Sequence, residues 1–233
     1  MSDLRDFPIT RRWPPRRAGA IQLYTLNTPN GAKPAIMLEE TGLDYDAHRI
    51  SIGDPEDQMT PEFLSLNPNN KIPAMIDPDG PDGRPMGLWE SGAMLIYLAD
   101  KTGRFLPRDG AARHHTIQWL MFQMGGVGPM FGQLGFFHRY RGREIEDKRP
   151  RDRYVNETRR LLGVLDRQLD GRDWITGDYS IADMATGPWV NNLVQNYDAG
   201  ELVGYADFAH VRAWVDRFVA RPAVQRGLAV GAA

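Results

Sequence analysis

The feature that most constrains the fold is Ile72-Pro73, which stands where a polar loop ends and a short apolar strand begins. Proline has no N–H, so it fits at the start of a strand and not in the middle of a ladder. An Ile-Pro bond is also one of the few peptide bonds that adopt cis at low cost. A cis bond would turn the N–H and C=O of Ile72 outward, where an extended peptide can pair with them like an added strand.

A second motif, Glu90-Ser91-Gly92, stands at the start of a helical pattern. Side chains and N–H groups at a helix start form a small site for a carboxylate. A loop that pairs with a peptide backbone, together with a helix start that binds a carboxylate, indicates a peptide-like ligand with an acidic end. Plain helix capping by Ser91 is the alternative, but it leaves Glu90 unexplained.

The composition argues against several classes of protein. The formal net charge of −2 gives no general attraction to nucleic acid or anionic membranes. No apolar run approaches the ~20 residues that span a bilayer. The chain has no cysteine, which excludes a disulfide framework, a thiolate metal site and a nucleophilic thiol of its own. We expect a cytoplasmic protein without metal, nucleic-acid or membrane partners, whose thiol chemistry depends on a thiol brought by the ligand.

Strand and helix patterns divide the chain into two domains. Residues 21–102 follow the order β-α-β-α-β-β-α. After a linker at 103–112, strand signals stop and amphipathic helices continue over residues 113–233. The sequence therefore predicts an α/β domain followed by an all-α domain.

Residues 1–20 precede the first strand and contain clustered arginines around Trp13-Pro14-Pro15. Two prolines and clustered charge argue against a helix or strand. We expect an N-terminal arm that is loose or packs on a neighbouring subunit. A nucleic-acid tail is the weaker alternative, because two arginine pairs are a weak basic run in a slightly acidic chain.

Four motifs in this order resemble a cytosolic glutathione transferase. They are Thr28-Pro29-Asn30-Gly31 after the first strand, Ile72-Pro73, Glu90-Ser91, and Ser180-Ile181-Ala182-Asp183 in the helical half. Residues 67–74 and 89–93, and Trp119 followed by the Gly-rich stretch 125–130, are similar to the bacterial nu class. This class contains disulfide-reductase-like members and is related to the fungal nitrogen-regulator prion protein. The resemblance runs from residue 21 to near residue 225. It implies a thioredoxin-like N-terminal domain, an all-helical C-terminal domain, glutathione as cosubstrate and a homodimer.

Glutathione is γ-Glu-Cys-Gly, and the resemblance assigns each part to a motif. The hydroxyl and N–H of Ser91 would bind the γ-glutamyl carboxylate, and the Glu90 carboxylate would bind the ammonium. The backbone of Ile72, beside a cis Pro73, would pair with the cysteinyl residue. A tight turn without a ligand is the alternative at Pro73.

Three further residues are candidates for ligand contact. Gln58 and Lys71 lie in loops that are near the glycyl end in such folds, although both are also ordinary solvated surface residues. Arg153 matches in position a glutathione-contacting arginine of the subgroup. A solvated charge run explains Arg153 equally well, because Arg149 and Arg151 are close in sequence.

The nucleophile must be the thiolate of glutathione, since a free thiol with a pKa of about 8.5 is mostly protonated at neutral pH. Many transferases place Tyr, Ser or Cys after the first strand to stabilise the anion, whereas this turn holds Thr28 and Asn30. We assign these two residues to thiol contact and thiolate stabilisation. An Asn-Gly turn with Thr28 as a helix cap is the alternative.

The departure from Tyr or Ser catalysis points away from ordinary conjugation, and the nu-class resemblance implies reduction of disulfides and organic hydroperoxides. Without a protein cysteine, one glutathione would attack the substrate disulfide and a second would resolve the mixed disulfide. The prediction is a homodimeric glutathione-dependent disulfide-bond reductase acting on small-molecule disulfides or hydroperoxides. The alternatives are a non-catalytic glutathione-binding regulatory protein of the same fold and a conventional transferase that conjugates a small electrophile.

Overall fold

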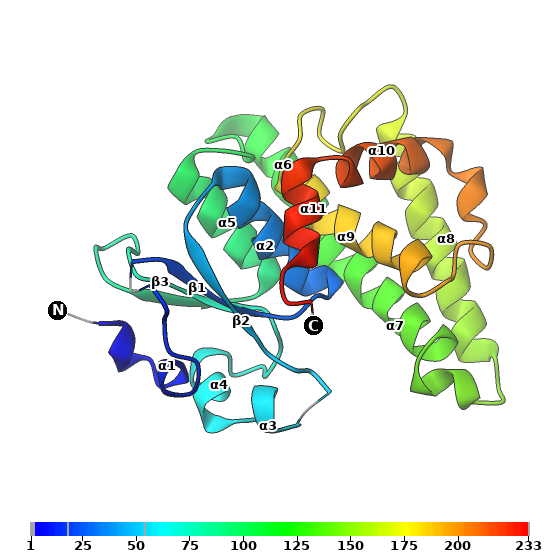
Figure 1. The fold of residues 1–233 in the computed structure, drawn as a ribbon. Helices are drawn as coiled ribbons and strands as arrows, with labels where there is room; N and C mark the ends of the chain where they lie inside the picture. Colours follow the sequence, from blue (N-terminus) through cyan, green and yellow to red (C-terminus); the bar gives the residue numbers. More distant parts are fainter. Residues whose placement is uncertain (1–2, 18, 54, 233) are drawn as a thin grey trace. The chain divides into compact units, whose positions relative to one another are not determined.

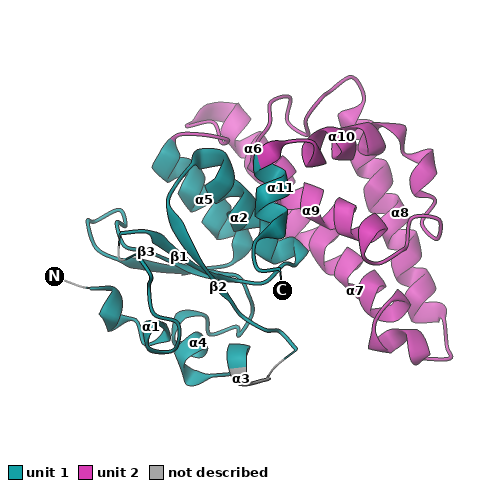
Figure 2. Ribbon diagram, in the orientation of Figure 1, with its two compact units in different colours: residues 1–102, 223–233 teal, residues 103–222 magenta. Residues whose placement is uncertain are grey.

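The computed structural model describes residues 3–17, 19–53 and 55–232. Contacts divide the chain into two compact units, drawn in different colours in Figure 2. The first is Met1–Thr102 with Ala223–Ala233, and the second is Gly103–Pro222. The expected boundary between an α/β part and a helical part lies near the point where the first unit ends, at Thr102.

The first unit is built on a four-stranded mixed sheet (Figure 1). Its strands are β1 (Ile21–Thr25), β2 (Tyr45–Arg49), β3 (Ala74–Asp77) and β4 (Met86–Trp89), in the order β2-β1-β3-β4. β1 pairs in parallel with β2, and β3 is antiparallel to both β1 and β4. Every residue of β1 and β3 is buried, as expected of central strands that are covered on both faces.

Helices cover both faces of this sheet, as Figure 1 shows. α2 (Pro29–Thr41) and α5 (Ser91–Thr102) pack against each other on one face. α3 (Pro55–Gln58) and α4 (Pro61–Leu66) lie on the other. The three layers and the strand order confirm the predicted thioredoxin-like domain.

The N-terminal segment differs from the expected arm without regular structure. It forms a 3-10 turn, η1 (Leu4–Asp6), and a short helix, α1 (Ile9–Arg12), with Ile9 fully buried. Pro14 and Pro15 follow the end of α1, so they do not interrupt it. The buried Asp46 carboxylate accepts the Arg17 backbone N–H at 2.8 Å and its Nε–H at 3.0 Å. Apolar burial and this ion pair therefore attach the segment to its own sheet.

The end of the chain also differs from the expected all-α domain, which ran to residue 233. α11 (Pro222–Ala229) leads into residues that group with the first unit. Gly227 permits this packing, because a Cβ there would stand 2.6 Å from the Ile36 Cα on α2. Arg226 adds an ion pair to Glu39 at 2.6 Å.

The second unit is built from helices, which confirms the predicted all-helical C-terminal half. They are α6 (Gly110–Phe122), the π-helical turn η2 (Gln123–Val127), α7 (Gly128–His138), η3 (Arg141–Glu144), α8 (Arg149–Leu169), α9 (Ile181–Gln195), η4 (Tyr205–Asp207) and α10 (Ala209–Val219). The π turn overlaps the glycine-rich stretch 125–130 and separates α6 from α7. Among the described helices, none has the length and apolar character needed to cross a membrane.

Asp183, the third residue of α9, organises the core of this unit. Ser180 and Asp183 form a capping box. The same carboxylate also accepts the Ile175 N–H at 3.0 Å and the Trp214 Nε1–H at 2.9 Å. Burial raises the pKa of Asp183 to about 6, although these hydrogen bonds favour the charged form. One side chain therefore joins the start of α9, the preceding loop and α10.

Candidate functional site

The loop before β3 is held by the buried side chain of Asn67. Its Oδ1 accepts the Asn69 N–H at 2.9 Å, and its Nδ2 donates to the carbonyl of Lys71. The Ile72-Pro73 bond that follows is cis, as the sequence predicted. Within the described residues, neither the N–H nor the C=O of Ile72 makes a backbone hydrogen bond. The part of the chain that the structure describes therefore leaves the Ile72 backbone without a backbone partner directly before β3.

The start of α5 lies beside this loop because of the strand register. Ala74 of β3 pairs with Trp89 of β4, so the residues before Ala74 and those after Trp89 meet at the same edge of the sheet. Glu90 is exposed, has a φ of 70°, and accepts the Met94 N–H at 3.0 Å. Ser91 is the first residue of the helix and is only 4% exposed. The first-turn N–H groups of a helix have no partner within the helix, so this end favours an anion.

The start of α2 belongs to the same edge. Tyr24 of β1 pairs with Ala74, so the carboxyl end of β1 lies next to the start of β3. Thr28 is the N-cap of α2, and its Oγ1 accepts the Gly31 N–H at 3.1 Å. This hydrogen bond caps the helix, and because Thr28 Oγ1 accepts in it, the hydroxyl hydrogen can still be donated to a ligand. Asn30 follows in the first turn and is half-buried.

A residue that the sequence reasoning missed, Lys33, lies behind this edge on α2. Its side chain is 1% exposed, and its Nζ donates to Ser91 Oγ at 3.3 Å. Burial lowers the pKa of Lys33 to about 7, while the negative charge of Glu90 acts in the opposite direction. The signal that could have found it is a single charged residue in the buried, largely apolar stretch 31–38 of α2.

Three further candidates were named from the sequence. Gln58, at the end of α3, donates to the Ile52 carbonyl at 3.2 Å, and its Oε1 is buried without a hydrogen-bond partner among the described residues. Lys71 is in the loop before Ile72 and is exposed. Arg153 is on α8 in the second unit.

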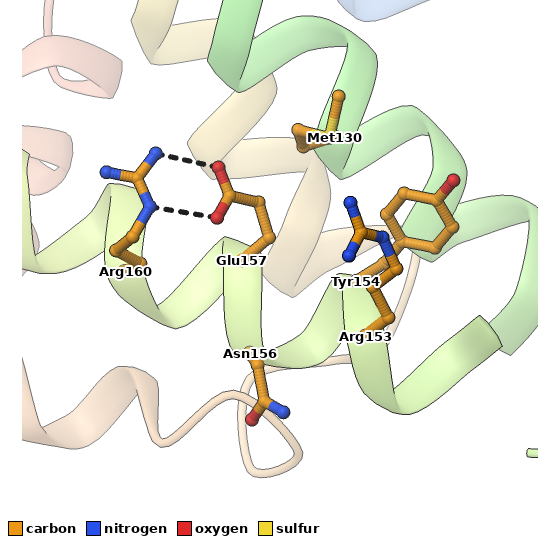
Figure 3. A pocket seen from close by; sticks show the side chains of 6 residues that line it. All are labelled: Met130, Arg153, Tyr154, Asn156, Glu157 and Arg160. Carbon is orange, nitrogen blue, oxygen red and sulfur yellow. Dashed lines mark hydrogen bonds and ion pairs between the residues drawn. The ribbon is translucent and has the colours of Figure 1, made fainter. Parts of the chain in front are cut away.

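Arg153 lines a cavity of about 640 Å³ in that second unit, shown in Figure 3. The other lining residues are Met130, Tyr154, Asn156, Glu157 and Arg160. Glu157 and Arg160 form an ion pair at 2.7 Å, whereas Arg153 lies beside Tyr154. Across the described parts of both units, no group of three or more His, Asp or Glu side chains could hold a metal ion.

The chain matches two family models over most of its length. Residues 28–101 match the glutathione S-transferase N-terminal domain, and residues 130–222 match the glutathione S-transferase C-terminal domain. Among curated proteins, it is 44% identical to the disulfide-bond oxidoreductase YghU of Escherichia coli, over 89% of this chain and 73% of that protein.

Two solved structures of bacterial glutathione transferases are more similar still. One, from Pseudomonas putida, holds one glutathione disulfide per subunit; it is 60% identical with a TM-score of 0.95, covering 97% of this chain and 98% of that one. Another, from Burkholderia graminis, holds two glutathione molecules per subunit; it is 64% identical with a TM-score of 0.95, covering 98% and 95%. These similarities confirm the nu-class-like resemblance, and the chain belongs to the glutathione S-transferase family.

Proposed function

We propose that this protein binds glutathione and uses its thiolate to reduce small-molecule disulfides. The observation that carries the proposal is the single sheet edge at which three segments meet: the start of α2, the backbone of Ile72 and the start of α5. A tripeptide with a carboxylate at one end and a thiol in the middle complements these features. The relatives with glutathione or its disulfide bound support the same ligand.

Two parts of glutathione have assigned partners at this edge. Ser91 binds the γ-glutamyl carboxylate through its hydroxyl and the N–H groups of the first helical turn. The exposed carboxylate of Glu90 binds the ammonium of the same residue. The N–H and C=O of Ile72, which make no backbone hydrogen bond to a described residue, bond to the cysteinyl backbone, as in the addition of a strand.

The cysteinyl sulfur is then assigned to the start of α2. Donation from the Thr28 hydroxyl and the Asn30 amide, together with the positive end of α2, favours the thiolate over the thiol. The thiolate attacks one sulfur of the substrate disulfide, forms a mixed disulfide and expels the other sulfur as a thiolate. A second glutathione thiolate attacks the glutathione sulfur of the mixed disulfide, forming glutathione disulfide and releasing the second product thiol.

The less central assignments belong to the same proposal. Gln58 and Lys71 bind the glycyl carboxylate, and Arg153 binds a carboxylate of glutathione. Organic hydroperoxides are reduced by two glutathiones to the alcohol and water, with glutathione disulfide as the other product. A reducing cytoplasm supplies the glutathione that this chemistry consumes, and the active form is a homodimer.

Calorimetric titration tests glutathione binding directly. We expect the protein to bind glutathione disulfide, or two molecules of reduced glutathione per subunit. Replacement of Ser91 by alanine should weaken binding about tenfold or more, because a hydrogen bond to a charged group contributes roughly 1.5–3 kcal/mol. Ser65→Ala, at an exposed serine of α4, is the matched control and should bind normally. Absence of binding to both forms of glutathione would contradict the proposal.

A further inference from the structure

Lys33 places a buried ammonium group between α2 and α5, in a space that an apolar side chain could fill. A buried lysine is costly, because desolvation disfavours its charged form. Its neighbours on α2 are apolar; Ala32, Ala35 and Ile36 are all buried. A residue with this cost in a helix core indicates a role that an aliphatic side chain cannot perform.

The bond between Lys33 and Ser91 has a fixed direction. An ammonium has only donors, so Lys33 Nζ donates and Ser91 Oγ accepts. The hydrogen of the Ser91 hydroxyl is therefore not directed at Lys33, and a ligand carboxylate bound at Ser91, as assigned above, can accept it.

We propose that Lys33 is a positioning and specificity residue, which orients the Ser91 hydroxyl and gives the site its preference for an anionic α-carboxylate on the γ-glutamyl group. This inference rests on the proposed glutathione binding and extends it. Lys33 acts through Ser91 and through its charge, and it is not a catalytic residue.

The charged surroundings of Lys33 support this role. Glu90, directly before α5, is a charged group near Lys33, and its negative charge acts to raise the pKa of Lys33. α11, which also packs on α2, carries Arg226, but this cation is paired with Glu39 near the other end of α2. Burial lowers the pKa of Lys33 to about 7 in the protein without a ligand carboxylate. A carboxylate bound at Ser91 favours the charged ammonium and raises this pKa again.

The first test compares two ligands that differ only in the carboxylate. They are S-methylglutathione and its analogue with a 4-aminobutyryl group in place of γ-glutamyl, which keeps the amine and lacks the carboxylate. We expect the natural protein to bind the analogue without the carboxylate about thirtyfold more weakly than S-methylglutathione. For Lys33→Met, the two affinities should differ by less than about threefold. If Lys33 had only a structural role, its replacement would change the affinities for the two ligands by the same factor and leave their ratio unchanged.

Two more variants complete this comparison. Lys33→Gln keeps a donor without the charge, and we expect it to lose discrimination as well, so the test does not depend on the folding of one variant. Lys101→Met removes a lysine near the other end of α5, where Tyr97 still donates to Asp77, and should keep the full ratio. Full discrimination in both Lys33 variants would overturn the inference while leaving glutathione binding intact. Failure of the natural protein to bind S-methylglutathione would instead contradict the proposed function.

The pH dependence of binding is an independent readout of the same role. Below the free pKa of about 7, Lys33 is charged before and after binding, so its contribution is constant. Above this value binding must add a proton, so the affinity of the natural protein for S-methylglutathione should fall as the pH rises from 7 to 8.5. Lys33→Met has no such group, so its affinity should fall less steeply over this range, and only as the ligand's own ammonium, assigned to Glu90, loses its proton. Parallel pH profiles for the two proteins would contradict the role of Lys33.

Discussion

Replacement of Asn30 by alanine is expected to lower the rate of glutathione-dependent disulfide reduction at least about tenfold, a transition-state cost of ~1.4 kcal/mol. Asn30 lies in the first turn of α2, half-buried at the sheet edge. Its amide is assigned to the cysteinyl sulfur, and loss of a donor to an anion makes the thiolate harder to form. Steady-state kcat/KM with a small disulfide at fixed pH measures the effect.

Asn27→Ala is the matched control for Asn30, because it removes an exposed amide from the same loop. We expect its rate to equal that of the natural protein. In Asn30→Ala, the pKa of the bound glutathione thiol, followed by thiolate absorbance, should rise toward that of free glutathione. An unchanged rate and an unchanged thiol pKa would remove Asn30 from the mechanism.

The second large effect is on stability. Replacement of Asp183 by alanine is expected to lower the free energy of unfolding by about 3 kcal/mol or more, because each buried donor left without an acceptor costs roughly 1–3 kcal/mol. The donors are the N–H groups of Ile175 and Ser180 and the indole of Trp214, at 3.0, 3.0 and 2.9 Å from the carboxylate. Urea unfolding measures the change.

Asp178→Ala provides the comparison for Asp183, since it removes an exposed carboxylate two residues before the capping box. Its unfolding midpoint should match that of the natural protein. A cost below about 1 kcal/mol for Asp183→Ala would mean that these donors find other partners, and that the carboxylate does not organise the second unit.

Local patterns in the sequence were sufficient for most of the sheet edge. Pro73 marked the start of β3 and its cis bond, because proline chemistry is local. The turn at 28–31 was also found from short-range rules. Its position beside the loop before β3 follows from the strand register, which local patterns in the sequence do not give.

Features that depend on contacts distant in sequence were missed. The role of Asp183 beyond capping required Trp214, 31 residues away. The packing of residues 223–232 within the first unit depends on the contact of Gly227 with Ile36. The position of residues 3–17 depends on the buried Asp46, whose partner Arg17 belongs to what the sequence showed only as a weak basic run. Lys33 was overlooked because helix periodicity does not show which buried position faces Ser91.

The most direct test of the central claim is turnover of a small disulfide, such as bis(2-hydroxyethyl) disulfide, by the full-length protein with reduced glutathione. Glutathione disulfide and the released thiol are quantified by chromatography against the uncatalysed reaction. The account predicts a rate well above this background that saturates with glutathione and is inhibited by S-methylglutathione. A rate equal to background, in a protein that calorimetry shows to be saturated with glutathione, would contradict it.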